Sequence, residues 1–422
     1  MTRDILNNRI SIPGGYVDSD NPADAAIRET LEETGVPVEA VGELARMNNA
    51  ILFDCRATSP IPVLKTDTDK ARVAAWQAEH FGREVRAVYL MKPNQEMLDN
   101  ARFPEQVEMF PALVPLASPS PIQLFDDFSR LSSPFNTWNA SLNRDFQQAI
   151  DALPSSLAKT VSVFLDYASA LGSGVLFFLL IPVALATGGL KRLAQLLFVT
   201  VAVTVVVAFG KLFFAVPRPF YLFPELQLAS ASGFAFPSGH TATAFAIWGL
   251  IYTWLNHARK VTVAVWLIPA VLVALSRVYL GVHYVTDVLA GAVLGALAVL
   301  GAQRLTASIL TTRFWLVLGA LIVPFALTQI QPTFLYCAAF SLTFAGTLAI
   351  TNQQFKGQTN TPMGWKGFLV ALAGMVALAA GLYFVSQISN SSIEILIAST
   401  MTVALLAVWL GFVTPRWCQP HD

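Results

Sequence analysis

The chain has 422 residues, of which 55% are hydrophobic and only 13% are charged, and its formal net charge is zero. Because soluble domains usually carry about a quarter charged residues, this composition excludes an entirely soluble protein, and the balanced charge predicts no nucleic-acid partner. Residues 1–150 hold 21 of the 27 acidic residues, which predicts a soluble front part and a membrane part behind it. The three cysteines are far apart in sequence and predict neither a disulfide framework nor a zinc site.

The first informative stretch is GGYVDSDNPADAAIRETLEETGV, residues 14–36. Glu29, Glu32 and Glu33 are three and four residues apart, so on the first turns of a helix they share one face. Grouped carboxylate oxygens suit Mg²⁺, which bridges to the oxygens of a diphosphate. The stretch therefore predicts a candidate metal site made by these three glutamates.

This stretch resembles the Nudix box, G-x5-E-x7-R-E-U-x-E-E-x-G-U, where U is a bulky aliphatic residue. Asp20 and Thr30 depart from the pattern, and the residues that match it are Gly14, Arg28, Glu29, Glu32, Glu33, Gly35 and Val36. The resemblance implies an α/β domain over residues 1–115 and Mg²⁺ as its cofactor. Only 13 residues precede the box, so the domain is expected to be truncated at its beginning. Whether it hydrolyses a diphosphate or only senses one stays open.

Three strands are expected after the box, in VEAVGELARM, AILFDCRA and REVRAVYLM. Residues 116–141 are rich in Pro and Ser and are predicted to form a linker. Residues 142–164 have apolar positions at helical spacing, interrupted by Pro154, and predict an interfacial helix.

The rest of the chain predicts an all-α polytopic membrane bundle of about nine spans. Each apolar run is long enough, or nearly so, for about 30 Å of hydrocarbon. The runs lie near 165–187, 194–214, 241–256, 261–281, 285–303, 313–330, 333–351, 366–386 and 392–413. The bundle divides into a domain over 142–305 and additional helices over 306–414, whose role the sequence does not indicate.

The distribution of Lys and Arg between these runs predicts the orientation, because basic loops stay in the cytoplasm. Most basic residues fall on one side, which places the C-terminus in the cytoplasm. Lys211, Arg218 and Arg277 fall on the opposite side. They break the charge rule, which indicates that function rather than topology keeps them there.

The clusters KLFFAVPRP, FPSGH and SRVYLGVHYVTD all belong to this non-cytoplasmic side. Three fixed cations predict a site for a dense anion such as phosphate. Ser238 and Gly239, just before a helix start, would add backbone N–H groups. His283 and Asp287 are four residues apart, so a helix would place them on one face, where the carboxylate can orient the imidazole.

These clusters match, in order, the three-part signature of the type 2 phosphatidic acid phosphatase superfamily, which residues 142–305 resemble. The resemblance implies a membrane phosphatase with His283 as nucleophile, Asp287 as its partner and His240 as the proton donor. It also implies that phosphate is held, without a cofactor, by Lys211, Arg218, Ser238, Gly239 and Arg277. The expected substrate is a lipid phosphate such as undecaprenyl diphosphate, phosphatidylglycerol phosphate or phosphatidic acid.

Other functions stay open at this point. A phosphotransferase would pass the phosphoryl group to a second lipid, and a transporter or flippase would move an anionic lipid and use the front domain as a sensor. The expected location is the inner membrane, with the phosphatase site on the outer side. The expected partners are the bilayer and a lipid phosphate, and the sequence does not indicate an oligomeric state.

Overall fold

The structure is a computed structural model that describes residues 1–17, 21–47, 50–66, 68–329, 331–354 and 361–418. It divides into two compact units. Unit 1 comprises residues 1–134 together with the short segments 220–225 and 231–234, and unit 2 comprises the remainder. Unit 1 contains helices and strands and unit 2 is helical, which confirms the predicted fold class at this level.

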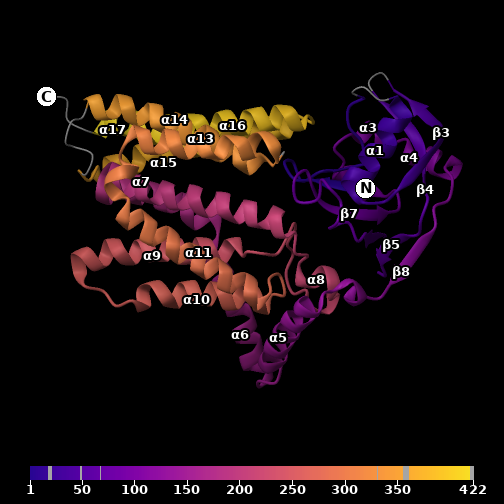
Figure 1. The fold of residues 1–422 in the computed structure, drawn as a ribbon, viewed down its shortest axis with the longest axis horizontal. Coiled ribbons are helices and arrows are strands. Elements are labelled where there is room, and N and C mark those ends of the chain that lie inside the picture. Colours follow the sequence, from indigo (N-terminus) through magenta and orange to yellow (C-terminus); the bar gives the residue numbers. More distant parts are fainter. Residues whose placement is uncertain (18–20, 48–49, 67, 330, 355–360, 419–422) are drawn as a thin grey trace. The chain divides into compact units, whose positions relative to one another are not determined.

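Unit 1 is a small α/β fold (Figure 1). Its largest sheet has the order β2-β1-β7-β6, β3 pairs with β4 in an antiparallel ladder, and β5 pairs with β8 in parallel. The three strands that the sequence predicts after the box are confirmed as β3, β4 and β7. The strands are β1 (Thr2–Asp4), β2 (Ile10–Ser11), β3 (Val38–Arg46), β4 (Ile51–Ala57), β5 (Ile61–Leu64), β6 (Lys70–Arg72), β7 (Val85–Met91) and β8 (Ile122–Phe125).

The principal helix of unit 1 is α1 (Pro22–Thr34). The Asn21 side chain accepts hydrogen bonds from two backbone N–H groups of the first turn, and the helix ends at Gly35 with φ 72°. This N-cap starts the helix earlier than the sequence suggests, so the glutamates lie in its second half rather than in its first turns. Asp20, at the departing position of the box, lies outside the described residues.

The segment predicted as a linker, residues 116–141, contains ordered structure. Strand β8 within it pairs with β5 in the register Ile61↔Ile122 to Leu64↔Phe125. Backbone hydrogen bonds to β5 therefore tie this segment to unit 1. The short helical segments of this unit are α2 (Gln95–Asp99), α3 (Pro104–Val107), α4 (Phe110–Leu113), η1 (Val114–Leu116) and η2 (Ser129–Leu131).

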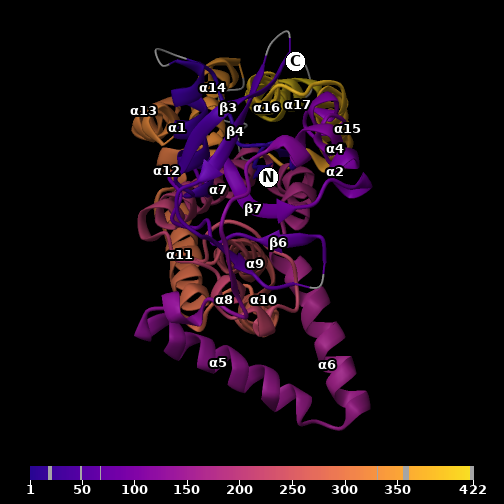
Figure 2. The same ribbon diagram turned by 90° about the vertical axis from the view of Figure 1, so that its right-hand side faces the viewer.

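Unit 2 opens with two amphipathic helices, α5 (Pro134–Asp151) and α6 (Ser155–Ala168), which Figure 2 shows as separate arms. The chain breaks between them at Pro154, as the sequence predicts. Both helices expose aromatic side chains, including Trp138 and Tyr167. Their position at a membrane interface stays a prediction.

Helix α7 (Gly174–Phe214) joins two of the predicted spans across a kink at Gly189, where φ is 59°. The first of these spans was predicted from residue 165. The structure instead ends α6 at Ala168 and makes a 3₁₀ turn, η3 (Ser169–Gly172), before α7 begins. The later elements are α8 (Pro219–Leu222), η4 (Pro224–Leu226), α9 (Gly239–Arg259), α10 (Ala264–Tyr279), α11 (Val285–Arg304), α12 (Thr306–Ile309), α13 (Thr312–Thr328), α14 (Pro332–Gln354), α15 (Gly364–Ile388), α16 (Ser392–Val408), η5 (Trp409–Val413) and α17 (Thr414–Cys418).

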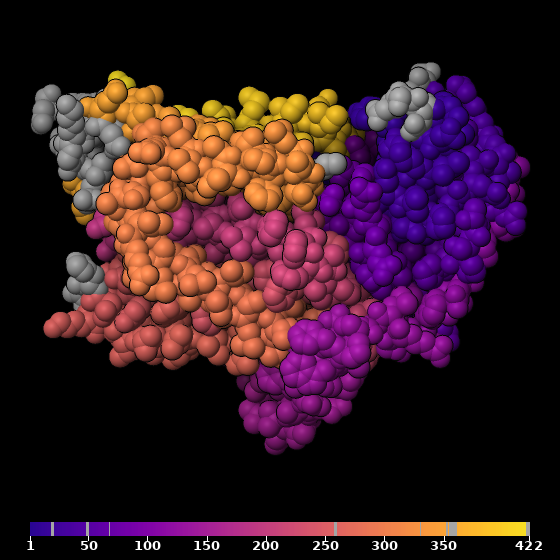
Figure 3. All heavy atoms as spheres, viewed as in Figure 1, coloured from indigo at the N-terminus to yellow at the C-terminus, as the bar shows by residue number. Residues whose placement is uncertain are grey.

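Within the described residues, five helical segments are long and apolar enough to cross a membrane. They are Gly174–Leu222, Val285–Arg304, Pro332–Thr351, Gly364–Ile388 and Ser392–Cys418, and Ala264–Tyr279 and Thr312–Thr328 are shorter apolar helices. The count of nine spans stays a prediction. Helices α13 and α14, whose atoms are orange in Figure 3, expose apolar side chains such as Leu321 in α13 and Ile350 in α14.

Helix α9 packs against α7, α10 and α11. The approach of α11 to α9 depends on small residues, because a Cβ at Gly291 would lie 2.6 Å from the Ser238 carbonyl oxygen. Close approach through glycine is a common way to pack helices in membranes. This contact fixes the beginnings of α9 and α11 beside each other.

Candidate functional site

Four helix ends in unit 2 carry the side chains that the sequence singles out. Lys211 lies in the last turn of α7 and Arg277 in the last turn of α10. Ser238 caps the beginning of α9, and Asp287 lies in the first turn of α11. Helix beginnings are electropositive, so two of them and several cations together form a strongly anion-attracting site.

His283 is at the centre of this arrangement and is buried with 2% of its surface exposed. Its Nδ1 lies 3.3 Å from Asp287 Oδ2, and its Nε2 lies 3.3 Å from a guanidinium nitrogen of Arg218. Because an arginine can only donate hydrogen bonds, Nε2 must be the acceptor and Nδ1 must carry the proton. The geometry therefore leaves the Nε2 lone pair directed towards the cations.

His283 and Asp287 are in contact, as expected from the sequence. They do not, however, lie on one face of a helix, which the spacing of four residues suggested. His283 precedes the helix, which begins at Val285 after the cap residue Tyr284. Asp287 Oδ2 accepts a hydrogen bond of 2.7 Å from the Tyr284 backbone N–H. The same oxygen therefore caps the helix and faces the imidazole, because capping turns the carboxylate back towards the preceding residues.

Of the cations, Arg218 contacts the imidazole, and Lys211 and Arg277 lie in the last turns of α7 and α10. Arg218 is 5% exposed and donates a 2.7 Å hydrogen bond to the Val282 carbonyl oxygen, which fixes its guanidinium next to the imidazole.

The FPSGH segment enters from the beginning of α9. The Ser238 backbone N–H donates to the Asp287 carbonyl oxygen at 3.0 Å. The Ser238 hydroxyl lies 3.0 Å from the Thr241 hydroxyl. Gly239 and His240 occupy the first two helical positions. The arrangement brings all eight residues proposed from the sequence to neighbouring helix ends.

Sequence reasoning missed three residues that hold this site. Arg277 donates a 2.7 Å hydrogen bond to the Ser169 hydroxyl, and a Cβ at Gly172 would lie 2.6 Å from the His240 carbonyl oxygen. Asn143 bonds to the backbone of the turn that carries His283. The sequence does contain a signal for Asn143, because its polar carboxamide lies on the apolar side of the amphipathic helix α5.

In unit 1, the structure brings two of the three predicted metal ligands together with a residue that was not predicted. Donor atoms of Glu29, Glu32 and His80 all lie within 4.8 Å of one another. Arg28 forms ion pairs with Glu29 at 2.9 Å and with Glu32 at 3.0 Å. A Cβ at Gly15 would collide with the Glu29 carboxylate, so the glycine loop closes over this cluster. Two carboxylates and one imidazole within reach of one point fit a divalent cation.

Glu33 lies outside that group. It interacts with the Thr2 hydroxyl, and burial raises the pKa of its carboxyl to about 8. Glu33 is thus buried in unit 1, where the charge of Glu29 also acts on it.

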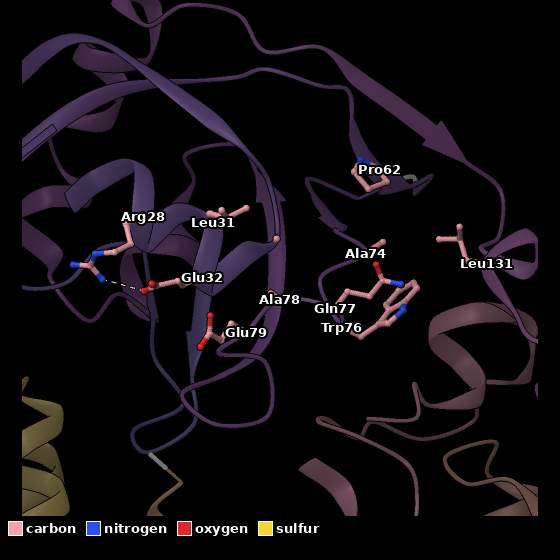
Figure 4. A pocket seen from close by; sticks show the side chains of 11 residues that line it. Arg28, Leu31, Glu32, Pro62, Ala74, Trp76, Gln77, Ala78, Glu79 and Leu131 are labelled. Atoms are coloured by element: carbon pink, nitrogen blue, oxygen red, sulfur yellow. Dashed lines mark hydrogen bonds and ion pairs between the residues drawn. The ribbon is translucent and has the colours of Figure 1, made fainter. Parts of the chain in front are cut away.

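A cavity of about 510 Å³ adjoins the cluster. Figure 4 shows Arg28, Glu32 and Glu79 on one side of it and Trp76 and Gln77 on another. Charged groups and an aromatic side chain around one cavity can accommodate an anionic group and a flat ring. This cavity lies entirely within unit 1.

Comparison with known families gives two matches. Residues 192–313 match the model of the PAP2 superfamily, and residues 2–113 match the model of the NUDIX domain. The chain therefore contains a front region that matches the NUDIX domain and a later region that matches the PAP2 superfamily, called the NUDIX domain and the PAP2 domain below. The PAP2 match includes every residue proposed for the phosphate site, and the NUDIX match includes the Glu29–Glu32–His80 cluster.

Similar proteins are found for the PAP2 domain. The chain is 45% identical over 77 residues to phosphatidylglycerophosphatase B of Bacillus subtilis (strain 168), covering 17% of this chain and 38% of that protein. It is 46% identical over 66 residues to bacitracin transport permease protein BcrC of Bacillus licheniformis, covering 16% of this chain and 30% of that protein. The alignments thus span only 38% and 30% of the length of these relatives. With its membrane-spanning candidate helices, the chain is a multi-pass membrane protein.

Two solved structures are also similar. One is the crystal structure of Aquifex aeolicus LpxE, with 27% identity and a TM-score of 0.33, covering 39% of this chain and 95% of that one. The other is a transmembrane PAP2 type phosphatidylglycerolphosphate phosphatase from Bacillus subtilis, with 25% identity and a TM-score of 0.33. It covers 42% of this chain and 94% of that one.

Proposed function

We propose that the PAP2 domain is a membrane lipid phosphatase that acts through a phosphohistidine. The observation that carries the proposal is the position of His283 between Asp287 and Arg218, with Nδ1 facing the carboxylate and Nε2 facing the guanidinium. A buried imidazole with an orienting carboxylate on one nitrogen is the arrangement of an activated nucleophile. The surrounding cations supply the electrostatic stabilisation that a phosphoryl group needs.

The proposed reaction has two steps. The Nε2 lone pair of His283 attacks phosphorus, the P–O ester bond breaks, and the leaving oxygen takes a proton from His240. Water then attacks the phosphohistidine, His240 accepts the water proton, and the P–N bond breaks to release phosphate. Throughout, Asp287 holds the proton on Nδ1 and stabilises the positive charge that develops on the ring.

The proposed substrate has its phosphate at the membrane surface, because the cations lie at helix ends rather than in mid-helix. Phosphatidylglycerol phosphate, phosphatidic acid and undecaprenyl diphosphate all fit this description. The name of the Bacillus subtilis relative favours the first. We propose that the site faces the outer side of the inner membrane, because its three cations break the charge rule for cytoplasmic loops.

We expect the purified full chain to release phosphate from at least one of these three lipids, with rates unchanged by a chelator. The reason is that Lys211, Arg218 and Arg277 replace a metal in charge compensation. Phosphate release with and without EDTA measures this. Absence of release from all three lipids would contradict the proposal, as would release that EDTA abolishes.

Two other outcomes would indicate a different function. Discharge of the phosphoenzyme by added lipid rather than water would indicate a phosphotransferase. Lipid movement in proteoliposomes that survives His283→Ala would indicate a flippase.

We propose as a second activity that the NUDIX domain hydrolyses or binds a nucleoside diphosphate compound. The supporting observation is the cluster of Glu29, Glu32 and His80 beside the cavity that Trp76 lines. A divalent cation held there would neutralise diphosphate charge. Arg28, which pairs with both glutamates, would orient their carboxylates, and Trp76 would contact the nucleoside ring.

We expect Glu32→Gln to reduce Mg²⁺-dependent cleavage of a nucleoside diphosphate compound by about 10–100-fold, because one anionic ligand is lost. Glu39→Gln, at an exposed position of β3, is the matched control and should have no effect. Product formation by the full chain across a Mg²⁺ titration measures both variants. An equal loss of cleavage in both variants, or cleavage that Glu32→Gln does not change, would refute the assignment of this cluster. Binding of the compound without cleavage by the unchanged protein would indicate a sensor.

A further inference from the structure

Helix α5 lies outside the region that matches the PAP2 model, yet it contacts the turn that carries His283. Asn143 is fully buried in this helix. Its Nδ2 donates one hydrogen bond of 2.8 Å to the Val278 carbonyl oxygen and another of 2.9 Å to the His283 carbonyl oxygen. Both neighbours are carbonyl oxygens, so only the amide nitrogen can face them, which settles the orientation of the side chain.

The two carbonyl groups lie at the two ends of the turn between α10 and α11. Val278 belongs to the last turn of α10, and His283 is the second residue before α11. Between them Gly281 adopts φ 67°, so the backbone reverses sharply there. Carbonyl groups at a helix end need partners from outside the helix. Asn143 bridges this turn and so fixes where the His283 backbone lies.

Gln147, one helical turn further along α5, makes an equivalent bridge. Its Nε2 donates to the Tyr279 carbonyl oxygen at 2.7 Å and to the Leu226 carbonyl oxygen at 3.0 Å. Residues four apart share a helix face, so the two amides form one row. The row connects the histidine turn to the segment that follows Arg218.

We propose that Asn143, assisted by Gln147, is a positioning residue that sets the distance of the His283 imidazole from the reacting phosphorus. This inference rests on the proposed phosphatase function. Misplacement of a reacting group by about 1 Å can reduce a rate about 10²-fold. Loss of the bridge should therefore lower the rate of the chemical step while leaving substrate binding by the cations largely intact.

The chain offers a matched control for each amide. Asn139 is also fully buried in α5, but its Nδ2 donates to the Phe135 carbonyl oxygen of the same helix at 3.2 Å. Gln148 is the neighbour of Gln147 and is exposed. Asn143→Ala and Asn139→Ala remove the same buried group, and only the first loses bonds to the histidine turn.

The experiment measures kcat, KM and the rate of phosphoenzyme formation for the full chain in detergent, with phosphatidylglycerol phosphate as probe. We expect Asn143→Ala to lower kcat and phosphoenzyme formation by about 10–100-fold with KM changed by less than about threefold, and Asn139→Ala to stay within about threefold in kcat. Gln147→Ala should lower kcat by a smaller factor than Asn143→Ala. Gln147 is half-buried, so this position tolerates substitution more readily. Gln148→Ala should leave kcat unchanged.

The outcomes separate the two proposals. If the unchanged protein releases no phosphate from this probe or the other lipids, the phosphatase function itself fails. If it is active and both members of each pair behave alike, the positioning role is overturned. A purely structural role would lower thermal stability in Asn143→Ala and Asn139→Ala alike, and it would leave kcat per folded molecule unchanged. Should Asn143→Ala not fold, the Gln147 and Gln148 pair decides the question.

Discussion

Replacing His283 by Ala is expected to lower lipid phosphate release by at least about 10³-fold, because loss of a nucleophile leaves only binding and electrostatic contributions. His283 is almost completely buried and is the one imidazole with an orienting carboxylate among the described residues of unit 2. The measurement is steady-state phosphate release by the purified full chain, together with trapping of an acid-labile phosphoenzyme, which should disappear in the variant.

The control for this substitution is His80→Ala, which removes an imidazole from unit 1 and should leave lipid phosphate release unchanged. Because a buried cavity can destabilise the fold, His283→Gln provides a second variant that retains most of the side-chain volume. Turnover in either His283 variant within about tenfold of the unchanged protein, a barrier difference of only about 1.4 kcal/mol, would remove His283 from the nucleophile role.

The second large effect is expected at Asp287. Asp287→Asn should lower kcat by about 10²–10⁴-fold, because the amide removes the negative charge beside Nδ1 and no longer selects the tautomer in which Nε2 is unprotonated. The amide oxygen can still accept the hydrogen bond from the Tyr284 backbone N–H, which is 2.7 Å long in the structure. We therefore expect the beginning of α11 to remain intact.

Comparison of two substitutions separates chemistry from folding at this position. Asp287→Ala removes both the charge and the helix cap, and loss of a cap costs about 0.5–2 kcal/mol of stability. Asp287→Asn should thus lose activity at nearly unchanged thermal stability, and Asp287→Ala should lose both. If Asp287→Asn retained full activity, the carboxylate would serve only as a cap.

The two candidate sites differ in what their sequence motifs revealed. In the PAP2 domain, the FPSGH motif correctly indicated the beginning of α9, because Ser238 is a capping residue whose effect is local. The spacing of His283 and Asp287 suggested one helix face, whereas the structure places His283 before α11. In the NUDIX domain, the spacing of Glu29, Glu32 and Glu33 indicated a shared face. The structure groups Glu29 and Glu32 with His80 and buries Glu33 near Thr2 and Glu29, because burial is a property of the folded interior.

The sequence by itself determined the division into an α/β part and a helical part and the apolar runs, and it indicated the eight residues that we propose for the phosphate site. These features are encoded by composition, periodicity and spacing, which act over a few residues. Strand β8 was missed within a segment rich in Pro and Ser, because its pairing with β5 joins residues about 60 positions apart.

Only the tertiary structure decided which residues support the site. Asn143 reaches carbonyl groups 135 and 140 residues away, Ser169 meets Arg277 across 108 residues, and His80 joins Glu32 from a separate segment. A buried amide or hydroxyl needs a partner, but its chemistry does not specify which distant backbone group will supply it. That choice is made when helices pack, so it cannot be read from spacing along the chain.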